Sequence, residues 1–461
     1  MRTDSVGSDD IARGLARIRQ EFALPDGFAP EVIDAAGRSA ALHPGGDRID
    51  RTDLPFITLD PATATDLDQA FCLEQSGDDL ILRYAIADVG WFVRPGDPLD
   101  REAWSRGTTM YLPDGKVSLY PTDLSEGAAS LLPDGPRPAV VFVVRLDSAG
   151  VPRLDAVERA LVRSRAKLAY DTVTDDDLPP SMPDFAARMA AADEARGAAR
   201  VEPPEQEVER DGEAYRIAYR PRLAAEEMNA ALSLATNLAV AAALFEARTG
   251  LYRVMDEPDD RAIRRLRHTA RAMGVPWAGP VSLADFERSL ISSDPRHAAI
   301  MLAIRRAGGG ARYVGYEPDV VPWHAAMAAT YAHATAPLRR LADRHVVLAA
   351  LAVAGARPVD ADLAAAFADL PEVMQRADAI GNRIDRAVID LVEAVVLRGQ
   401  EGRTFAAVVT DVDDRGARIQ LCDVAVVSRV SIDRVEPGDE VRVKLVEANP
   451  AERLVRFERV A

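Results

Sequence analysis

Three aspartates, Asp60, Asp66 and Asp68, stand close together in the segment "ITLDPATATDLDQAF". The apolar residues on both sides are typical of strands, so we expect the acids in the connection between two strands. Carboxylate oxygens that converge in this way are the ligands that Mg²⁺ prefers. A bound divalent cation can polarise a phosphoryl oxygen and activate water, so the segment suggests hydrolysis of a phosphate ester. The residue after the last acid is Gln69, a neutral amide.

Acid-rich turns are also common without a metal, because aspartate side chains accept hydrogen bonds from nearby backbone amides. A calcium loop of the EF-hand type fits poorly, since the segment has neither the central glycine nor the closing glutamate at the required spacing. Taken alone, the segment therefore favours an ordinary turn over a catalytic site.

The composition limits the kind of protein this can be. The chain has 461 residues, about half of them apolar, which indicates two or three domains. Its formal charge of −17 argues against a protein that coats nucleic acid with its whole surface, although a local basic channel is compatible with it. Of the 56 basic residues only three are lysines. GC-rich coding explains this bias, but arginine also suits phosphate contacts.

From the sequence we expect neither an export signal nor a membrane-spanning segment. Residues 2–14 are polar, and no apolar run approaches the ~18 residues that span a bilayer. The two cysteines, Cys72 and Cys422, are far apart, which argues against a disulfide framework or a cysteine zinc site. We expect a cytoplasmic protein with no membrane partner. Nothing in the length or charge indicates an oligomer, so a monomer is the expectation.

The pattern of apolar residues predicts three domains and an α+β fold class. Residues 1–50 predict two short helices, residues 51–400 a catalytic domain of mixed β-sheet and long helices, and residues 401–461 a small barrel of the OB or S1 type. Five short alternating segments predict the strands of that barrel. The long helices of the middle domain are expected at 222–248, 259–274, 282–307, 338–354 and 371–398.

Three further segments change the interpretation of the acidic turn: "YLPDGKVSLYP", "LSEGAASLLPDGPRPAVVFVV" and "YAHATAPLRRLADRH". Together with the acidic segment, and in this order, they resemble the catalytic RNB domain of the ribonuclease II family over residues 56–398. The resemblance implies a processive 3′-to-5′ exoribonuclease that hydrolyses single-stranded RNA to nucleoside 5′-monophosphates. It also implies Mg²⁺ as cofactor, with Mn²⁺ as a substitute, and the 3′ end of RNA as partner.

The resemblance assigns roles to individual residues. Asp60, Asp66 and Asp68 match three of the four aspartates of the family's acidic motif, and Gln69 stands at the fourth position. These four residues form the expected metal site. Asp68 matches the acid that is most sensitive to substitution. Arg339 matches an arginine at the phosphate of the cleaved bond, so Asp66, Asp68 and Arg339 are the expected catalytic residues.

Other residues are expected to bind RNA. Arg340 would be a second phosphate contact, Tyr111 matches a tyrosine that clamps the terminal bases, and Tyr170 resembles one near the 3′-terminal ribose. Stacking on an aromatic ring binds any base, at roughly 1–3 kcal/mol each, so degradation should tolerate any sequence. Without the resemblance, both arginines would simply begin a solvated helix after Pro337. Tyr111 would then be a core residue at a strand edge.

Two features depart from the family pattern. The amide oxygen of Gln69 coordinates a cation weakly and without charge, so we expect a higher Mg²⁺ requirement. Many members carry two cold-shock barrels before the catalytic domain, whereas this chain reaches Asp60 without them. From Glu401 onward there are twelve acids and ten bases, with Phe405 and Phe457 as the only aromatic residues. We expect weak RNA binding outside the catalytic channel and, with it, a protein partner that delivers the RNA.

Two alternative functions remain open. A metal-dependent hydrolase of dinucleotides or short oligonucleotides would fit the missing barrels. An RNA-binding protein without catalysis would follow if Gln69 marks a degenerate site. The three aspartates and Arg339 favour an enzyme over this second alternative.

Overall fold

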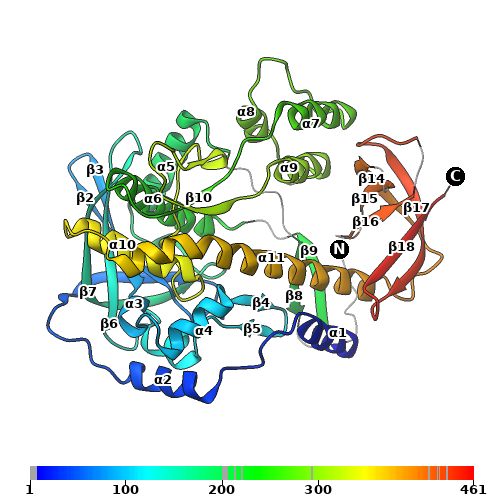
Figure 1. Ribbon diagram of the computed structural model, residues 1–461. Coiled ribbons are helices and arrows are strands. Elements are labelled where there is room, and N and C mark those ends of the chain that lie inside the picture. Colours follow the sequence, from blue (N-terminus) through cyan, green and yellow to red (C-terminus); the bar gives the residue numbers. More distant parts are fainter. Residues whose placement is uncertain are drawn as a thin grey trace.

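Five strands close into a barrel at one end of the protein, which is described here by a computed structural model (Figure 1). The structure describes residues 8–199, 206–211, 214–219, 222–291, 294–413, 416–422, 424, 426–431 and 434–460. The barrel order is β1-β2-β3-β6-β7, and β1 closes it by pairing in parallel with β7. Its strands are β1 (Ile49–Asp60), β2 (Gln69–Ser76), β3 (Asp79–Ala87), β6 (Arg137–Leu146) and β7 (Pro152–Ala169).

Alternating apolar residues fill the barrel interior, as the period of two in a strand requires. Phe71, Tyr84 and Phe142 are almost completely buried there. Strand β7 is 18 residues long and was not predicted, because its many charged side chains hide the alternation. The predicted limit between the first two domains, at residue 50, falls inside β1.

Long helices cover the barrel and connect it to the rest of the chain (Figure 1). Helices α6 (Ala224–Glu246) and α10 (Leu341–Ala354) contact β7, and α5 (Met182–Arg196) packs on α6. Helix α11 (Ala361–Leu397) runs from this region to the C-terminal sheet. It begins at Ala361 and not at 371, because Asp360 caps it and the helix continues through Pro371.

Helix α6 overturns the expectation that no apolar run is long enough to span a bilayer. By length and composition alone, Ala224–Glu246 is sufficient. More than half of its apolar window is buried against the barrel and neighbouring helices, which accounts for its composition.

The helices of the insertion between β10 and β11 form a separate small core. The predicted helix at 282–307 is in fact two helices. Ser282 caps the first, and Asp294 followed by Pro295 starts the second, which is a signal for a new helix. The elements of this region are β10 (Leu251–Val254), α7 (Asp260–Ala272), α8 (Leu283–Arg288), α9 (Pro295–Ala307) and β11 (Arg312–Gly315).

Short elements complete the middle of the chain and its beginning. The two predicted N-terminal helices are present, with α1 packed on α11 and α2 packed on α4. The remaining elements are α1 (Ser8–Glu21), α2 (Pro30–Ala40), α3 (Val89–Phe92), α4 (Pro98–Arg106), β4 (Met110–Leu112), β5 (Gly115–Val117), a π-helical turn (Leu124–Ala128), β8 (Gln206–Asp211), β9 (Ala214–Tyr219), β12 (Trp323–His324), β13 (Ala329–Thr330) and 3₁₀ turns at Asp175–Asp177 and Ala325–Met327.

The C-terminal residues form a five-stranded antiparallel sheet with its own hydrophobic core. Phe405 and Phe457, the two aromatic residues of this region, meet edge to face in that core, with their ring centres 6.0 Å apart. The sheet order is β16-β15-β14-β17-β18. The strands are β14 (Thr404–Asp413), β15 (Gly416–Leu421), β16 (Val427–Val430), β17 (Glu440–Asn449) and β18 (Leu454–Arg459). The predicted α+β class and the five-stranded C-terminal unit are confirmed.

Candidate active site

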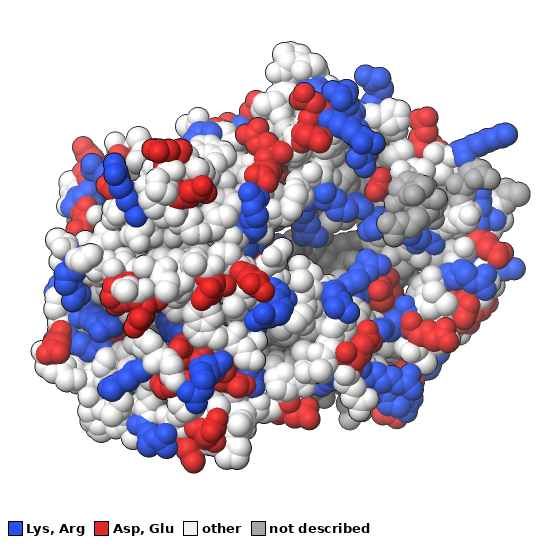
Figure 2. Space-filling view, in the orientation of Figure 1, with Lys and Arg blue, Asp and Glu red and all other residues white. Residues whose placement is uncertain are grey.

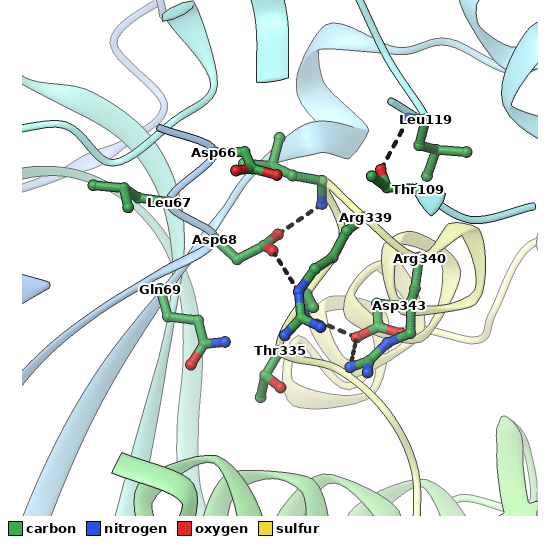
Figure 3. A network of polar contacts seen from close by, with 12 residues as sticks. Asp66, Leu67, Asp68, Gln69, Thr109, Leu119, Thr335, Arg339, Arg340 and Asp343 are labelled. Carbon is green, nitrogen blue, oxygen red and sulfur yellow. Dashed lines mark hydrogen bonds and ion pairs between the residues drawn. The ribbon is translucent and has the colours of Figure 1, made fainter. Parts of the chain in front are cut away.

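The acidic residues lie where two neighbouring barrel strands are connected. Asp60 is the last residue of β1, and Gln69 is the first residue of β2. Because β1 and β2 are antiparallel, residues 61–68 form a loop at this end of the barrel. Figure 3 shows Asp66, Asp68 and Gln69 beside the segment that carries Arg339 and Arg340.

Asp68 joins the acidic loop to the segment before α10. Its Oδ1 accepts a hydrogen bond from the backbone N–H of Leu338 at 2.7 Å, and its Oδ2 accepts one from Arg339 Nε at 3.2 Å (Figure 3). The side chain is only 3% exposed. Burial raises the pKa of Asp68 to about 7, although Arg339 and the Leu338 amide act in the opposite direction.

Asp60 is a second carboxylate with a raised pKa. Burial raises it to about 6 and the nearby charge of Asp66 adds to the effect, while Arg339 and Lys167 oppose it. Among the residues that the structure describes, none donates a hydrogen bond to the Asp60 carboxylate. Its oxygens therefore remain available for a cation.

Asp66 is held by two residues of the β4–β5 hairpin. Lys116 Nζ lies 2.8 Å from Asp66 Oδ1, and the Tyr111 hydroxyl donates to Asp66 Oδ2 at 3.2 Å. Lys116 also lies 3.1 Å from Glu126 Oε1. Burial alone would lower the pKa of Lys116, but its hydrogen bonds to Asp66 and Glu126 outweigh this, and the pKa is raised. The Tyr111 side chain remains 53% exposed, which leaves room for a base to stack on it.

Gln69 has a partner inside the barrel. Its Oε1 accepts a hydrogen bond from the hydroxyl of Tyr84, which is completely buried. That hydroxyl also lies 3.4 Å from Ser233 Oγ. The amide oxygen that we predict as a metal ligand thus already accepts a hydrogen bond from Tyr84. Coordination of a cation by Gln69 remains a prediction.

Arg339 and Arg340 are adjacent but have different surroundings. Arg339 is 39% exposed, so its guanidinium can reach a bound phosphate while its Nε holds Asp68. Its backbone oxygen accepts hydrogen bonds from Thr109 N at 2.9 Å and from Thr108 Oγ1 at 2.8 Å, which anchors the segment.

Arg340 turns toward Asp343 in a two-pronged ion pair, with Nε–Oδ1 at 2.9 Å and Nη2–Oδ2 at 2.8 Å (Figure 3). The Asp343 side chain is 0% exposed and also accepts the Ala336 N–H at 2.8 Å. This pair therefore holds the loop that presents Leu338 and Arg339 to Asp68. A phosphate contact by Arg340 remains a prediction.

Tyr170 follows β7 and lies beside Asp60. Its backbone N–H donates to the Asp60 carbonyl oxygen at 3.2 Å, and its hydroxyl accepts from Asn229 Nδ2 at 2.8 Å. Burial raises the pKa of Tyr170 to about 12, so the phenol stays protonated at neutral pH. The predicted ribose contact is thus next to the acidic loop.

The donor set has the chemistry of a site for a hard divalent cation. Asp60, Asp66 and Asp68 offer carboxylate oxygens, each with more than one lone pair. In the described part of the chain, no group of three or more acidic, histidine or cysteine side chains has the arrangement of a metal site. The charges of Arg339 and Lys116 balance two of the acids instead.

Sequence reasoning missed three participants in this site. They are the Leu338 amide, Asp343 and Lys116. All three belong to the quoted segments "YLPDGKVSLYP" and "YAHATAPLRRLADRH". Lys116 could have been noticed because it is one of only three lysines in the chain. The sequence around Asp343 does not distinguish this residue from an aspartate that caps a helix.

Comparison with known proteins identifies the family of the chain. The sequence model of the RNB domain matches residues 48–352, and that of the RNase II-type exonuclease C-terminal S1 domain matches residues 403–460. Ribonuclease R of Escherichia coli is 26% identical over 422 residues, which cover 84% of this chain and 52% of that protein. The chain thus spans about half the length of this relative.

Solved structures show the same fold. Mycoplasma genitalium RNase R, in complex with ribose-methylated single-stranded RNA, has a TM-score of 0.87 at 20% identity and covers 98% of this chain and 78% of its own. Yeast Ssd1, described as a pseudonuclease, has a TM-score of 0.68 at 17% identity. The match covers 90% of this chain and 54% of the Ssd1 chain. Because a pseudonuclease shares the fold, the fold alone says nothing about catalysis. The two domain matches and these folds confirm the predicted resemblance: the chain belongs to the RNB domain family and carries an RNase II-type C-terminal S1 domain.

Proposed function

We propose that the protein is a 3′-to-5′ exoribonuclease that hydrolyses single-stranded RNA processively to nucleoside 5′-monophosphates. The observation that carries the proposal is the contact of buried Asp68 with Arg339 and the Leu338 amide, which joins the acidic loop to the arginine segment. Its relatives, named ribonuclease R and exoribonuclease 2, support the same reaction. The 3′ end of RNA is the proposed partner and the cytoplasm the proposed place of action.

The chain's own residues suit the steps of phosphodiester hydrolysis. A divalent cation, Mg²⁺ or Mn²⁺, held by Asp60, Asp66 and Asp68 would supply polarisation of the phosphoryl oxygen and an activated water. Arg339 places a positive charge beside these acids, where it would stabilise negative charge that develops on the phosphate. Tyr111 would stack on a base near the cleaved bond, and the protonated phenol of Tyr170 would hydrogen-bond the terminal ribose.

The wild-type protein tests this proposal directly. We expect a 20-nucleotide single-stranded RNA, labelled at its 5′ end, to be converted in Mg²⁺ to a short labelled end product without accumulation of intermediates, and to remain intact in EDTA. Mass spectrometry should identify nucleoside 5′-monophosphates as products. Cleavage of dinucleotides without cleavage of the longer RNA would support the short-oligonucleotide hydrolase. RNA binding without cleavage in Mg²⁺ or Mn²⁺ would support the non-catalytic alternative.

The raised pKa values of Asp60 and Asp68 predict a dependence on pH. The two carboxyls keep a proton below about pH 6 and about pH 7, respectively, and a protonated carboxyl binds cations poorly. At subsaturating Mg²⁺ we expect the cleavage rate to fall as the pH is lowered from 8 to 6. Below the pKa of Asp68, the rate should fall about tenfold for each pH unit. Added Mg²⁺ should restore the rate, because metal and protons compete. A loss that excess Mg²⁺ does not reverse would contradict this.

An arginine cluster favours RNA over a dinucleotide as substrate. Arg306 on α9, Arg386 on α11 and Arg429 on β16 all lie near Arg418 on β15. Burial lowers the pKa of Arg418 and the three neighbouring charges lower it further, while Asp411, which also lies 3.7 Å from Arg306, opposes them. Arg418 and Arg429 face each other across the β15–β16 pair, where like charges destabilise a sheet. The Arg418 Nε is buried, and no group in the described part of the chain accepts a hydrogen bond from it. Phosphates would relieve this repulsion.

A basic hollow in the surface supports the same substrate. In Figure 2 the molecule is hollowed between α9 and α11, and Lys and Arg side chains border the hollow. The C-terminal sheet lies at the opposite end of the molecule from the barrel (Figure 1). This surface argues against the expectation that the acidic C-terminal domain makes RNA binding weak outside the active site.

Replacing Arg418 with glutamine is expected to raise KM for a 20-nucleotide RNA about fivefold and to leave dinucleotide hydrolysis unchanged. One phosphate contact fewer should also reduce the slope of log KM against log salt by about one. The measurement is initial rates at several salt concentrations. Arg456→Gln, an exposed arginine on β18, is the matched control. Equal effects of Arg418→Gln on both substrates would rule out a role in binding long RNA.

A further inference from the structure

Lys116 occupies an unusual place for one of only three lysines in the chain. It lies on the short strand β5, with its ammonium 2.8 Å from Asp66 and 3.1 Å from Glu126. Glu126 is itself fixed by the Thr65 hydroxyl, which donates to it at 2.6 Å. The ammonium is thus held between an acid of the proposed cleavage site and an acid of the π-helical turn Leu124–Ala128.

The charges around the acidic loop nearly cancel. Four carboxylates gather here, and three cationic side chains act on them, so the formal local charge is minus one when all four carboxyls are ionised. The carboxylates are Asp60, Asp66, Asp68 and Glu126, and the cations are Arg339, Lys116 and Lys167.

This balance limits how many divalent ions the site can hold. One divalent ion would turn the local charge to plus one, which attracts a phosphate. Two would raise it to plus three at short range, where like charges repel strongly. Gln69, as a neutral amide, does nothing to offset this excess.

We propose that Lys116 is a resident cation of this site, which neutralises Asp66 and Glu126 in place of a second divalent ion, so that the chain takes up one divalent ion. The proposal rests on the proposed function in that this ion serves RNA hydrolysis. Lys116 is a positioning residue in this scheme, because it acts through Asp66. The alternative is that Lys116 only braces the β4–β5 hairpin against the loop.

The two interpretations predict opposite changes in metal binding. We would titrate the full chain with Mn²⁺, without RNA, and count bound ions from the electron paramagnetic resonance signal of the free ion. The wild type should bind one ion. Lys116→Met removes a positive charge and should bind a second ion, with the first bound about tenfold more tightly. A bracing role predicts fewer or weaker ions in Lys116→Met, because the loop would lose its support.

Matched variants separate charge from structure. Lys116→Arg keeps the charge and should bind one ion, and the double variant Lys116→Met/Glu126→Gln restores the net charge and should also bind one. Lys444→Met, an exposed lysine on β17, should match the wild type. Circular dichroism would show whether Lys116→Met folds. If it does not, Lys116→Gln, which still donates a hydrogen bond, replaces it and should likewise bind a second ion.

Two results would overturn the proposal: two ions in the wild type, or no gain of ions in a folded Lys116→Met or Lys116→Gln variant. The ion count needs no RNA. Failure of the wild type to cleave RNA would therefore refute the proposed function. The number of bound Mn²⁺ ions would still test the proposed role of Lys116.

Discussion

Asp68→Asn is expected to lower mononucleotide release from single-stranded RNA by at least about 10³-fold, while RNA affinity stays within about twofold. The substitution removes the charge that pairs with Arg339 and that would bind the cation. Asparagine has nearly the same shape, and its carbonyl oxygen can still accept the Leu338 N–H. Release would be followed by chromatography of labelled RNA in Mg²⁺, and affinity by fluorescence anisotropy in EDTA.

The control for this variant is Asp78→Asn, which changes an exposed aspartate in the turn between β2 and β3. It should release mononucleotides at the wild-type rate. Undiminished release by Asp68→Asn would refute the site assignment. Loss of both release and affinity would indicate that Asp68 holds the RNA-binding surface together and is not specific to the reaction.

Asp343→Ala is expected to lower the free energy of unfolding by about 3–5 kcal/mol, because it leaves the Arg340 charge without its buried partner. The Ala336 N–H would lose its acceptor as well. The loop that carries Leu338 and Arg339 would then be less well held, so kcat should fall together with stability. Urea denaturation and initial rates on RNA measure the two effects.

A double variant tests the reason for this loss. Arg340→Met/Asp343→Ala removes both charges and should recover part of the stability, since no buried charge is left unpaired. It should not recover kcat, because the hydrogen bond to Ala336 is still missing. A loss below about 1 kcal/mol in Asp343→Ala would show that the ion pair does not hold this loop.

Local sequence patterns determined several parts of this protein. The acidic residues were expected between two strands and lie between β1 and β2, because flanking apolar runs define strand ends. The five C-terminal strands were expected for the same reason. The charged strand β7 was not expected, because its charges mask the alternation. The break between α8 and α9 was not expected either, although Asp294 caps α9.

Only the tertiary structure decided how the site residues act. Arg339 and Arg340 are adjacent residues of the same type. The packing around Asp343 nevertheless places Arg340 in an ion pair with Asp343 and leaves Arg339 beside Asp68. Likewise, the pairing of β2 with β3 gives the Gln69 oxygen a partner in Tyr84. The sequence alone determined which residue types are present and where strands begin. Contacts between residues as far apart as Asp68 and Leu338 depend on how the barrel closes and the helices pack, and no local pattern contains that information.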